Sequence, residues 1–138
     1  MSFAISFLLI DLDDTLAPEW DYVAGGYRAA AEVLARLSKE NVDILFNRFV
    51  YEHMKYGRYR IMDRMTAAFG MDPAVARSLV SAYRAHAPAM QFYPGARQAL
   101  QQLARSECKL AVVTDGAVEM QQRKVQAIGL EDLVDTVV

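Results

Sequence analysis

The apolar residues near the N-terminus form one short continuous run. Residues 4–10, AISFLLI, are almost all apolar, and the run ends at Asp11. A run of this length that is bounded by acidic turn residues is typical of a strand buried on both faces of a parallel sheet. Two similar runs, at residues 110–113 and 134–138, predict a second and a third strand.

Between the first two predicted strands, the apolar residues change to a helical spacing. Val23, Tyr27, Ala30, Leu34 and Leu37 are three or four residues apart, so they form one stripe of a helix that begins near residue 20. We expect this stripe to face the protein core.

Further helices are expected after this one. The second contains four apolar residues at helical spacing and ends at Gly57: Leu45, Phe46, Phe49 and Met54. The third covers residues 60–69, with Gly70 as its left-handed stop. Asp72-Pro73 predicts an N-cap and a first-turn proline for a fourth helix, which ends near His86.

The C-terminal half alternates helices and strands. A helix over 96–103 precedes the second strand, and a helix over 118–128, stopped by Gly129, follows it. This alternation predicts an α/β fold with a Rossmann-like parallel sheet. Residues 17–91 contain no strand candidate, so we expect them to form an inserted four-helix cap, with 1–16 and 92–138 as the α/β core.

Composition narrows the class of protein. The chain has 138 residues, of which 54% are hydrophobic, and a net charge of −2. This balance argues against nucleic-acid binding, which favours a basic surface. The single cysteine, Cys108, excludes an intrachain disulfide and fits a reducing compartment. The apolar N-terminal run is too short for a membrane span and lacks a basic region before it, so we expect a cytoplasmic protein without a membrane partner.

Three acidic residues follow the first strand directly. Asp11, Asp13 and Asp14 lie within four residues, where their charges repel one another. Such crowding indicates a bound cation, or chemistry that needs two carboxylates in different protonation states. Asp14 and Thr15 also have a simpler interpretation, as residues that cap the turn.

A second polar loop follows the second strand. In an open parallel sheet, ligands bind beyond the carboxyl ends of the strands, so both loops are expected at one edge. Asp11 could attack as a nucleophile or hold a cation, and Asp13 could act as a general acid and base. We expect backbone N–H groups and one hydroxyl to bind phosphate, from Leu12, Thr114, Asp115 and Gly116. Together these groups indicate phosphoryl transfer, although Thr-Asp-Gly alone is also an ordinary turn sequence.

The two loops resemble motifs of the haloacid dehalogenase-like (HAD) hydrolase superfamily. DLDDTL at 11–16 is similar to the first motif of that family, DxDx[TV], and VVTDG at 112–116 is similar to the second. The inserted helices resemble the helical cap of the family. PGARQALQQLA and the C-terminal QQRKVQAIGLEDLVDTVV resemble the phosphoglycolate phosphatase-like subgroup.

The resemblance implies a mechanism. Asp11 would attack phosphorus and form an aspartyl-phosphate, while Asp13 would protonate the leaving oxygen and then help water to hydrolyse the intermediate. The Asp11 side chain and the Asp13 carbonyl would hold Mg²⁺, and Thr114 would bind the phosphoryl group. An acidic residue at position 13 favours phosphoester chemistry over dehalogenation, whereas a sugar phosphomutase uses the same pair.

Two motifs of the family are not found in the sequence. The third-motif lysine and the fourth-motif acidic pair normally follow the point at which this sequence stops, so we expect a truncated core with impaired activity. Lys124 is interpreted as a surface or helix-end charge. Asp132 and Asp135 precede the third strand and are expected at the opposite edge. The first strand would then be an apolar sheet edge, open to self-association.

Substrate contacts are expected from the helical block. Five basic residues surround the Gly57 break: His53, Lys55, Arg58, Arg60 and Arg64. They form either a surface that meets an anionic substrate when the cap closes, or a solvated helix face. Arg58 and Trp20 are the candidate substrate-contacting residues.

The sequence therefore predicts a Mg²⁺-dependent phosphohydrolase that acts on a small phosphorylated metabolite. The alternative is a non-catalytic fragment or interaction module with the same fold. A phosphoacceptor signalling domain also clusters acids after its first strand, but it needs another strand ending in Asp near the middle of the chain, where this sequence is helical.

Overall fold

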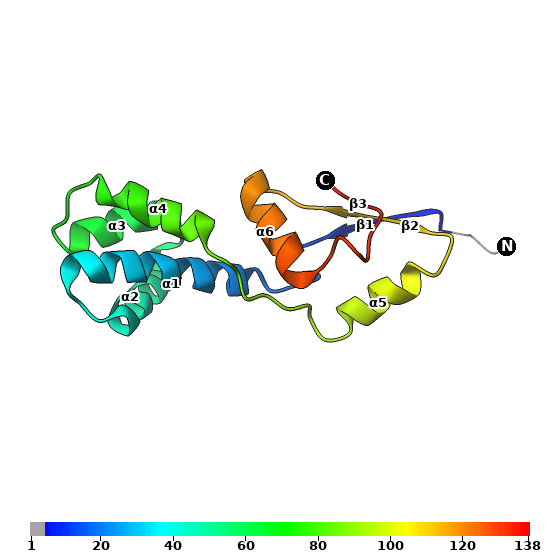
Figure 1. Cartoon of the computed structure of the whole chain (residues 1–138), viewed down its shortest axis with the longest axis horizontal. Helices are drawn as coiled ribbons and strands as arrows, with labels where there is room; N and C mark the ends of the chain where they lie inside the picture. The colour runs from blue at the N-terminus through cyan, green and yellow to red at the C-terminus, as the bar shows by residue number, and fades with distance from the viewer. Residues whose placement is uncertain (1–4) are drawn as a thin grey trace. The chain divides into compact units, whose positions relative to one another are not determined.

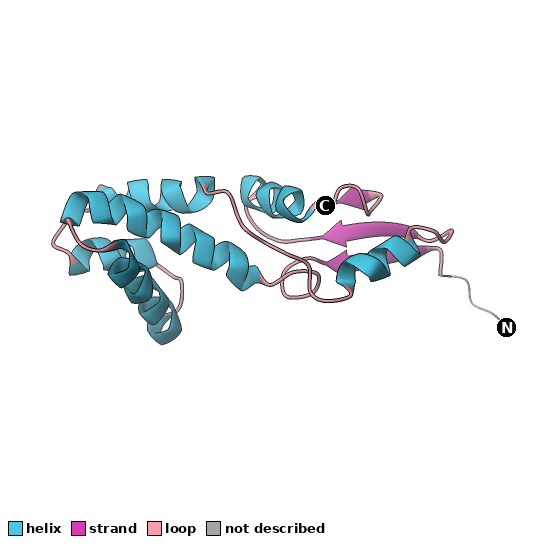
Figure 2. Ribbon diagram, turned by 60° about the horizontal axis from the view of Figure 1, so that its bottom comes forward, coloured by secondary structure: helices cyan, strands magenta, loops and turns pink. Residues whose placement is uncertain are grey.

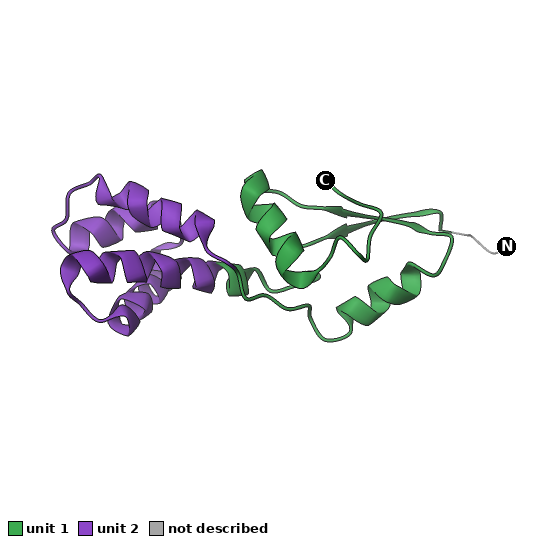
Figure 3. Cartoon of the chain, viewed as in Figure 1, with its two compact units in different colours: residues 1–22, 88–138 green, residues 23–87 purple. Residues whose placement is uncertain are grey.

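The structure, a computed structural model, describes residues 5–138 and divides the chain into two compact units (Figure 3). The first combines residues up to 22 with residues 88–138, and the second is formed by residues 23–87. The helical insertion is therefore compact by itself. The expected domain boundaries, after residues 16 and 91, stay a prediction.

A parallel sheet organises the first unit. Its strands are β1 (Phe7–Asp11), β2 (Lys109–Val113) and β3 (Thr136–Val137), in the order β1-β2-β3 (Figure 1). Phe7 pairs with Lys109 and Asp11 with Val113, so β1 and β2 end side by side. The predicted α/β class with a Rossmann-like parallel sheet is confirmed.

Helices α5 (Ala96–Leu103) and α6 (Val118–Ile128) complete this unit (Figure 2). Because parallel crossovers are right-handed and the strand order runs in one direction, both helices belong on one face of the sheet. Leu110 and Val112 point to that face and are buried. On the other face, Phe7 and Leu9 are 57% and 61% exposed.

The prediction that the first strand is buried on both faces is therefore wrong. Phe7 and Leu9 on its second face are exposed, because α5 and α6 of the same unit share the first face. The strand also begins at Phe7, after the predicted Ile5 and Ser6, and its pairing extends to Asp11; Ala4 of the predicted strand lies outside the described residues. The expectation that β1 forms an edge of the sheet is confirmed for the described part of the chain.

The second unit is helical, as predicted. It contains most of α1 (Glu19–Ser38), together with α2 (Val42–Tyr56), α3 (Ile61–Ala68) and α4 (Val75–Ala85). Val23, Tyr27, Ala30 and Leu34 are all buried in its core, which confirms most of the predicted stripe. Leu37 is 51% exposed, because it lies in the last turn of α1, beyond the core cluster.

Helix α2 is defined by clear signals at both ends. Asn41 accepts hydrogen bonds from the backbone N–H groups of Asp43 and Ile44, and Gly57 ends the helix with a φ of 71°. Leu45 and Phe49 face the core. Met54, which was predicted on the same stripe, is exposed, because five residues beyond Phe49 it has rotated away from the buried side.

The third and fourth helices are joined by a turn. Gly70 has the left-handed backbone expected of a helix stop. Helix α4 begins at Val75, two residues later than the predicted first-turn proline. The Asp72 carboxylate accepts from Ala74 N at 2.7 Å, and its carbonyl accepts from Val75 N, so residues 72–74 form a turn before the helix.

Two adjacent glycines allow α1 to approach the end of α4. A Cβ atom on Gly26 would lie 2.4 Å from the ring of Tyr83, and one on Gly25 would lie 2.8 Å from the His86 ring. Real Cβ atoms do not come so close, so larger residues there would push the helices apart. The two chain ends of the helical unit therefore touch each other.

Among residues 5–138, no helix combines the length and the apolar content that crossing a bilayer needs.

Candidate active site

The loop after β1 is built on Leu12. Its side chain is fully buried, and its carbonyl oxygen accepts hydrogen bonds from the N–H groups of Thr15, Leu16 and Ala17. The loop therefore folds tightly upon itself. Asp14 has a positive φ of 56°, which is uncommon for a residue with a side chain.

The side chains of the loop differ in their surroundings. Asp11 is exposed, and Thr15 Oγ1 donates to its carboxylate at 3.3 Å. Asp14 Oδ1 accepts from Glu19 N at 2.9 Å, so its side chain caps the start of α1, whereas the simpler interpretation had placed it as a cap of the turn. Burial raises the pKa of Tyr93, and the neighbouring Asp14 carboxylate raises it further.

The loop after β2 lies beside the first one, since β1 and β2 are paired up to Asp11 and Val113. The backbone N–H of Thr114 donates to the Val138 carbonyl at 2.9 Å. Its hydroxyl oxygen is buried and has no hydrogen-bond partner among the described residues. The hydroxyl can therefore donate to a ligand without first breaking a bond in the protein.

Gln121, which the sequence analysis did not consider, holds this second loop. Its side-chain amide donates to the Asp115 carbonyl, and a Cβ on Gly116 would lie 2.5 Å from the same amide nitrogen. Gly116 has a φ of 140°, which favours glycine. Gln121 precedes buried Val125 by four residues, so both lie on the same side of α6. This spacing is the sequence feature that could have indicated a structural role for Gln121.

Lys124 is buried, so its interpretation as a surface or helix-end charge is wrong. Only 2% of the residue is exposed. Its ammonium donates to both carboxylate oxygens of Asp13, at 2.8 and 2.6 Å, and lies 5.1 Å from the centre of the Tyr22 ring. Lys124 precedes Ile128 by one helical turn, on the buried stripe of α6, and this spacing could have indicated its burial.

Asp135 lies at the opposite edge of the sheet, as expected. Its carboxylate accepts from Leu110 N at 2.8 Å and from Lys109 Nζ at 2.9 Å, near the start of β2. The hydrogen bond from Leu110 and the lysine charge lower the pKa of Asp135. Asp132 lines a surface hollow of about 430 Å³ near the same end. Neither belongs to the candidate site.

The residues offer only part of a metal site. Within residues 5–138, no three His, Cys, Asp or Glu side chains lie close enough to hold a metal ion. The Asp11 carboxylate and the Asp13 carbonyl are nevertheless oxygen donors of the kind that Mg²⁺ takes together with water. These two groups are candidate donors for a metal ion and do not by themselves make a complete set of ligands.

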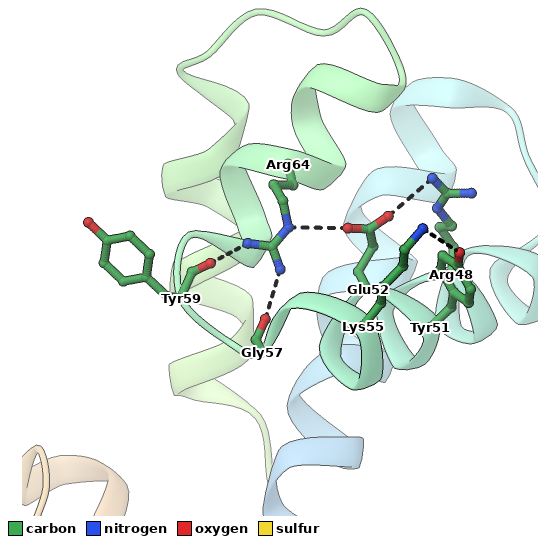
Figure 4. Close-up of polar contacts among 7 residues, drawn as sticks. All are labelled: Arg48, Tyr51, Glu52, Lys55, Gly57, Tyr59 and Arg64. Carbon is green, nitrogen blue, oxygen red and sulfur yellow. Dashed lines mark hydrogen bonds and ion pairs between the residues drawn. The ribbon is translucent and has the colours of Figure 1, made fainter.

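The helical unit carries the basic cluster, and several of its charges have partners there. Arg64 donates to Glu52 at 3.1 Å and to the carbonyls of Gly57 and Tyr59 (Figure 4). His53 is bonded to the Tyr27 hydroxyl at 2.7 Å.

Two other basic residues of the cluster also have local partners. Arg60 pairs with Asp63, and hydrogen bonds to the Tyr56 and Tyr51 hydroxyls raise the pKa of Lys55. Much of this basic surface therefore makes contacts within the helical unit.

The candidate substrate contacts are divided between the two units. Arg58 lies in the loop between α2 and α3 and is exposed, whereas Trp20 lies in the first turn of α1, in the unit that contains the sheet, and is 42% exposed. Contact of either residue with substrate stays a prediction.

A family model described as haloacid dehalogenase-like hydrolase matches residues 8–138, which is nearly the whole chain. The chain belongs to this family. Its match includes both loops at the carboxyl ends of β1 and β2. No curated protein sequence matches the chain significantly.

Solved structures share the fold of this HAD-like chain at low sequence identity. A HAD-superfamily hydrolase, subfamily IA, from Geobacter sulfurreducens has a TM-score of 0.65 and 19% identity, and the match covers 97% of this chain and 62% of that one. YfnB of Bacillus subtilis, solved with bound magnesium and revealing interdomain movement, has a TM-score of 0.56 and 15% identity over 96% and 62%. A HAD phosphatase from Thermococcus onnurineus has a TM-score of 0.53 and 25% identity over 98% and 61%. The chain thus spans about three fifths of the length of these relatives.

Proposed function

We propose that this HAD-like protein is a Mg²⁺-dependent phosphohydrolase that acts on a small phosphorylated metabolite, in a subgroup that resembles phosphoglycolate phosphatases. One observation carries the proposal: the register of β1 with β2 puts the Asp11 loop beside the Thr114 loop. Carboxylates and the buried Thr114 hydroxyl, which has no hydrogen-bond partner among the described residues, then share one edge of the sheet. This is a combination that phosphoryl transfer requires.

In the first step, a carboxylate oxygen of Asp11 attacks the phosphorus atom. The phosphorus–oxygen bond to the leaving group breaks, and Asp13 gives its proton to the departing oxygen. The product is an alcohol and an aspartyl-phosphate on Asp11. Thr114 Oγ1 and the loop N–H groups donate hydrogen bonds to the phosphoryl oxygens, where negative charge is concentrated.

In the second step, water attacks the same phosphorus atom and Asp13 takes a proton from it. The bond between phosphorus and the Asp11 oxygen breaks, so phosphate leaves and the carboxylate is restored. When bound, Mg²⁺ supplies positive charge that offsets the carboxylates and the phosphoryl group. The Asp11 side chain and the Asp13 carbonyl are the residues that would hold it.

The relatives support this proposal in outline. One similar structure is a HAD phosphatase, and another was solved with bound magnesium. Because no third acidic metal ligand gathers within residues 5–138, we propose that metal binding and turnover of this 138-residue chain are weak. Losing one electrostatic contact to a transition state costs about 10²–10³ in rate.

The test is hydrolysis of p-nitrophenyl phosphate by the full chain, with Mg²⁺ or with EDTA. The key variant is Asp11→Asn, and the matched control is Asp14→Asn, which changes the same chemical group three residues away and keeps an oxygen to cap α1. We expect Mg²⁺-dependent turnover that is lost in Asp11→Asn and kept in Asp14→Asn. Equal rates for Asp11→Asn and the unaltered chain would contradict the proposal.

A second candidate function is a non-catalytic interaction module. The exposed Phe7 and Leu9 on an edge strand favour it, since such edges pair with other chains. We propose self-association through β1, with sedimentation velocity as the measurement. Leu9→Lys is expected to shift an oligomer to monomer, whereas Leu37→Lys, at an exposed position in the helical unit, is expected to leave the distribution unchanged. A wild-type chain that is monomeric at all concentrations excludes this role.

A further inference from the structure

Lys124 is the most deeply buried charged group of the described chain, and it contacts the proposed general acid. Its residue is 2% exposed, whereas the Asp13 side chain keeps 21% of its surface exposed. The ammonium reaches across from α6 to the loop after β1, over 111 residues of sequence. The contact therefore joins two elements that only the folded sheet brings together.

The geometry of this contact restricts the rotation of the Asp13 carboxylate. Nζ lies 2.8 Å from one carboxylate oxygen of Asp13 and 2.6 Å from the other, so it holds both oxygens at once. A single hydrogen bond would leave the carboxylate free to rotate about its own axis, but a contact to both oxygens resists that rotation. The Tyr22 ring, 5.1 Å away and itself buried, limits the positions open to the ammonium.

Asp11 has no such contact in the described structure. Its carboxylate accepts a hydrogen bond from the Thr15 hydroxyl, at 3.3 Å. The proposed nucleophile, Asp11, is thus exposed and accepts one long hydrogen bond. The proposed acid, Asp13, is held at both carboxylate oxygens by the buried Lys124 ammonium. This asymmetry suits a site in which a proton donor must meet a leaving group at a fixed position.

We propose that Lys124 is a positioning residue that fixes the orientation of the Asp13 carboxyl group for proton transfer. The inference rests on the proposed phosphohydrolase function and adds to it a residue on α6 that acts through Asp13. Lys124 does not touch the phosphoryl group in this role. Its removal therefore affects only steps in which Asp13 transfers a proton.

The leaving group of the substrate distinguishes this role from a general loss of folded protein. Phenolate from phenyl phosphate is a poor leaving group and needs a proton as it departs, whereas dinitrophenolate departs readily without one. We expect Lys124→Met to lower kcat/KM on the order of 10²-fold for phenyl phosphate. For dinitrophenyl phosphate we expect a loss below about threefold, because aspartyl-phosphate formation then needs no acid.

The variants are chosen to isolate the contact. Lys124→Gln keeps an N–H donor, one bond closer to the backbone, and is expected to lose less than Lys124→Met. It carries the test if the methionine variant does not fold. Arg123→Met removes a positive charge from the next residue of α6 and serves as the matched control, with no change expected for either ester. In an Asp13→Asn background, Lys124→Met is expected to cause no further loss for phenyl phosphate.

Each other outcome overturns the proposal. Equal losses for the two esters, a full additional loss in the Asp13→Asn background, or a gain in rate with phenyl phosphate would show that Lys124 does not position the acid. Failure of the proposed function has a separate signature, since the unaltered chain would then match Asp11→Asn on both esters. In that case the positioning role is overturned together with it.

Discussion

The contacts of Glu52 allow a sharp test of the helical unit. This carboxylate is 6% exposed. It accepts a hydrogen bond from Arg64 of α3 and forms an ion pair with Arg48 of its own helix, each at 3.1 Å (Figure 4). The perturbation is to replace each arginine separately by methionine, which keeps an unbranched apolar stem and removes the charge. The two variants lose an ion pair of the same length to the same buried carboxylate.

The structure predicts very different costs. The Arg48 side chain is 49% exposed and makes an i,i+4 pair, for which exposed examples give about 0.3–0.5 kcal/mol. The Arg64 side chain is 30% exposed and also donates to two backbone carbonyls, so it ties α3 to the end of α2. Hydrogen bonds to charged groups contribute about 1.5–3 kcal/mol each, and removing a partner leaves Glu52 less compensated. We expect Arg64→Met to cost about 3 kcal/mol and Arg48→Met about 0.5 kcal/mol.

Urea denaturation followed by two signals measures this difference. Far-UV circular dichroism reports mainly on the helical unit, while the fluorescence of the single tryptophan, Trp20, reports on the unit that contains the sheet. The circular dichroism midpoint is expected to fall strongly in Arg64→Met and slightly in Arg48→Met. Equal losses of unfolding free energy in the two variants would refute the reasoning. The length and charge of the ion pair alone would then determine its contribution, and the burial and carbonyl contacts of Arg64 would add nothing.

Three further changes follow from contacts described above. Asn41→Ala removes an acceptor for two N–H groups at the start of α2, and a thermal melt is expected to show a loss of about 1 kcal/mol. Gly26→Ala drives a methyl group into the Tyr83 ring, so a net loss of about 1–2 kcal/mol is expected in urea, despite the better helix propensity of alanine. Asp135→Asn keeps an acceptor for Leu110 N but removes the charge. The pKa of Asp135 in the folded protein is lowered from its ordinary 3.8. The wild-type protein is therefore expected to have the higher urea midpoint at pH 7, and to lose this advantage as the pH falls through the lowered pKa. An advantage that does not shrink as the pH falls below 3.8 would contradict this assignment.

Local signals were sufficient for most of the elements. Helix α6 has the predicted bounds, residues 118–128, because an apolar stripe and a left-handed Gly129 mark it within a dozen residues. Helix α5 and strand β2 likewise follow from periodicity within the segment itself. The start of α4 was misplaced, since a turn with an aspartate acceptor and a helix N-terminus use the same residue types.

The errors concern burial that depends on distant segments. Whether Phe7 and Leu9 are covered depends on the handedness of crossovers whose helices, α5 and α6, begin more than 80 residues later, so a continuous apolar run does not decide it. Lys124 is similar: its burial requires the Asp13 carboxylate, and a lysine without a known partner is normally expected at the surface. Sequence motifs identified the loops of the site but not the residues that hold them, Lys124 and Gln121.

The interrupted first unit has a consequence for synthesis on the ribosome. Strand β1 cannot pair until residues 109–113 have emerged, whereas the helical unit is contiguous and can form earlier. Because Gly25 meets His86, a folded helical unit shortens the loop to be closed from about a hundred residues to about forty, which lowers the closure cost by about 1 kcal/mol. The insertion then acts as an internal folding aid, which holds the two halves of the sheet close enough to pair.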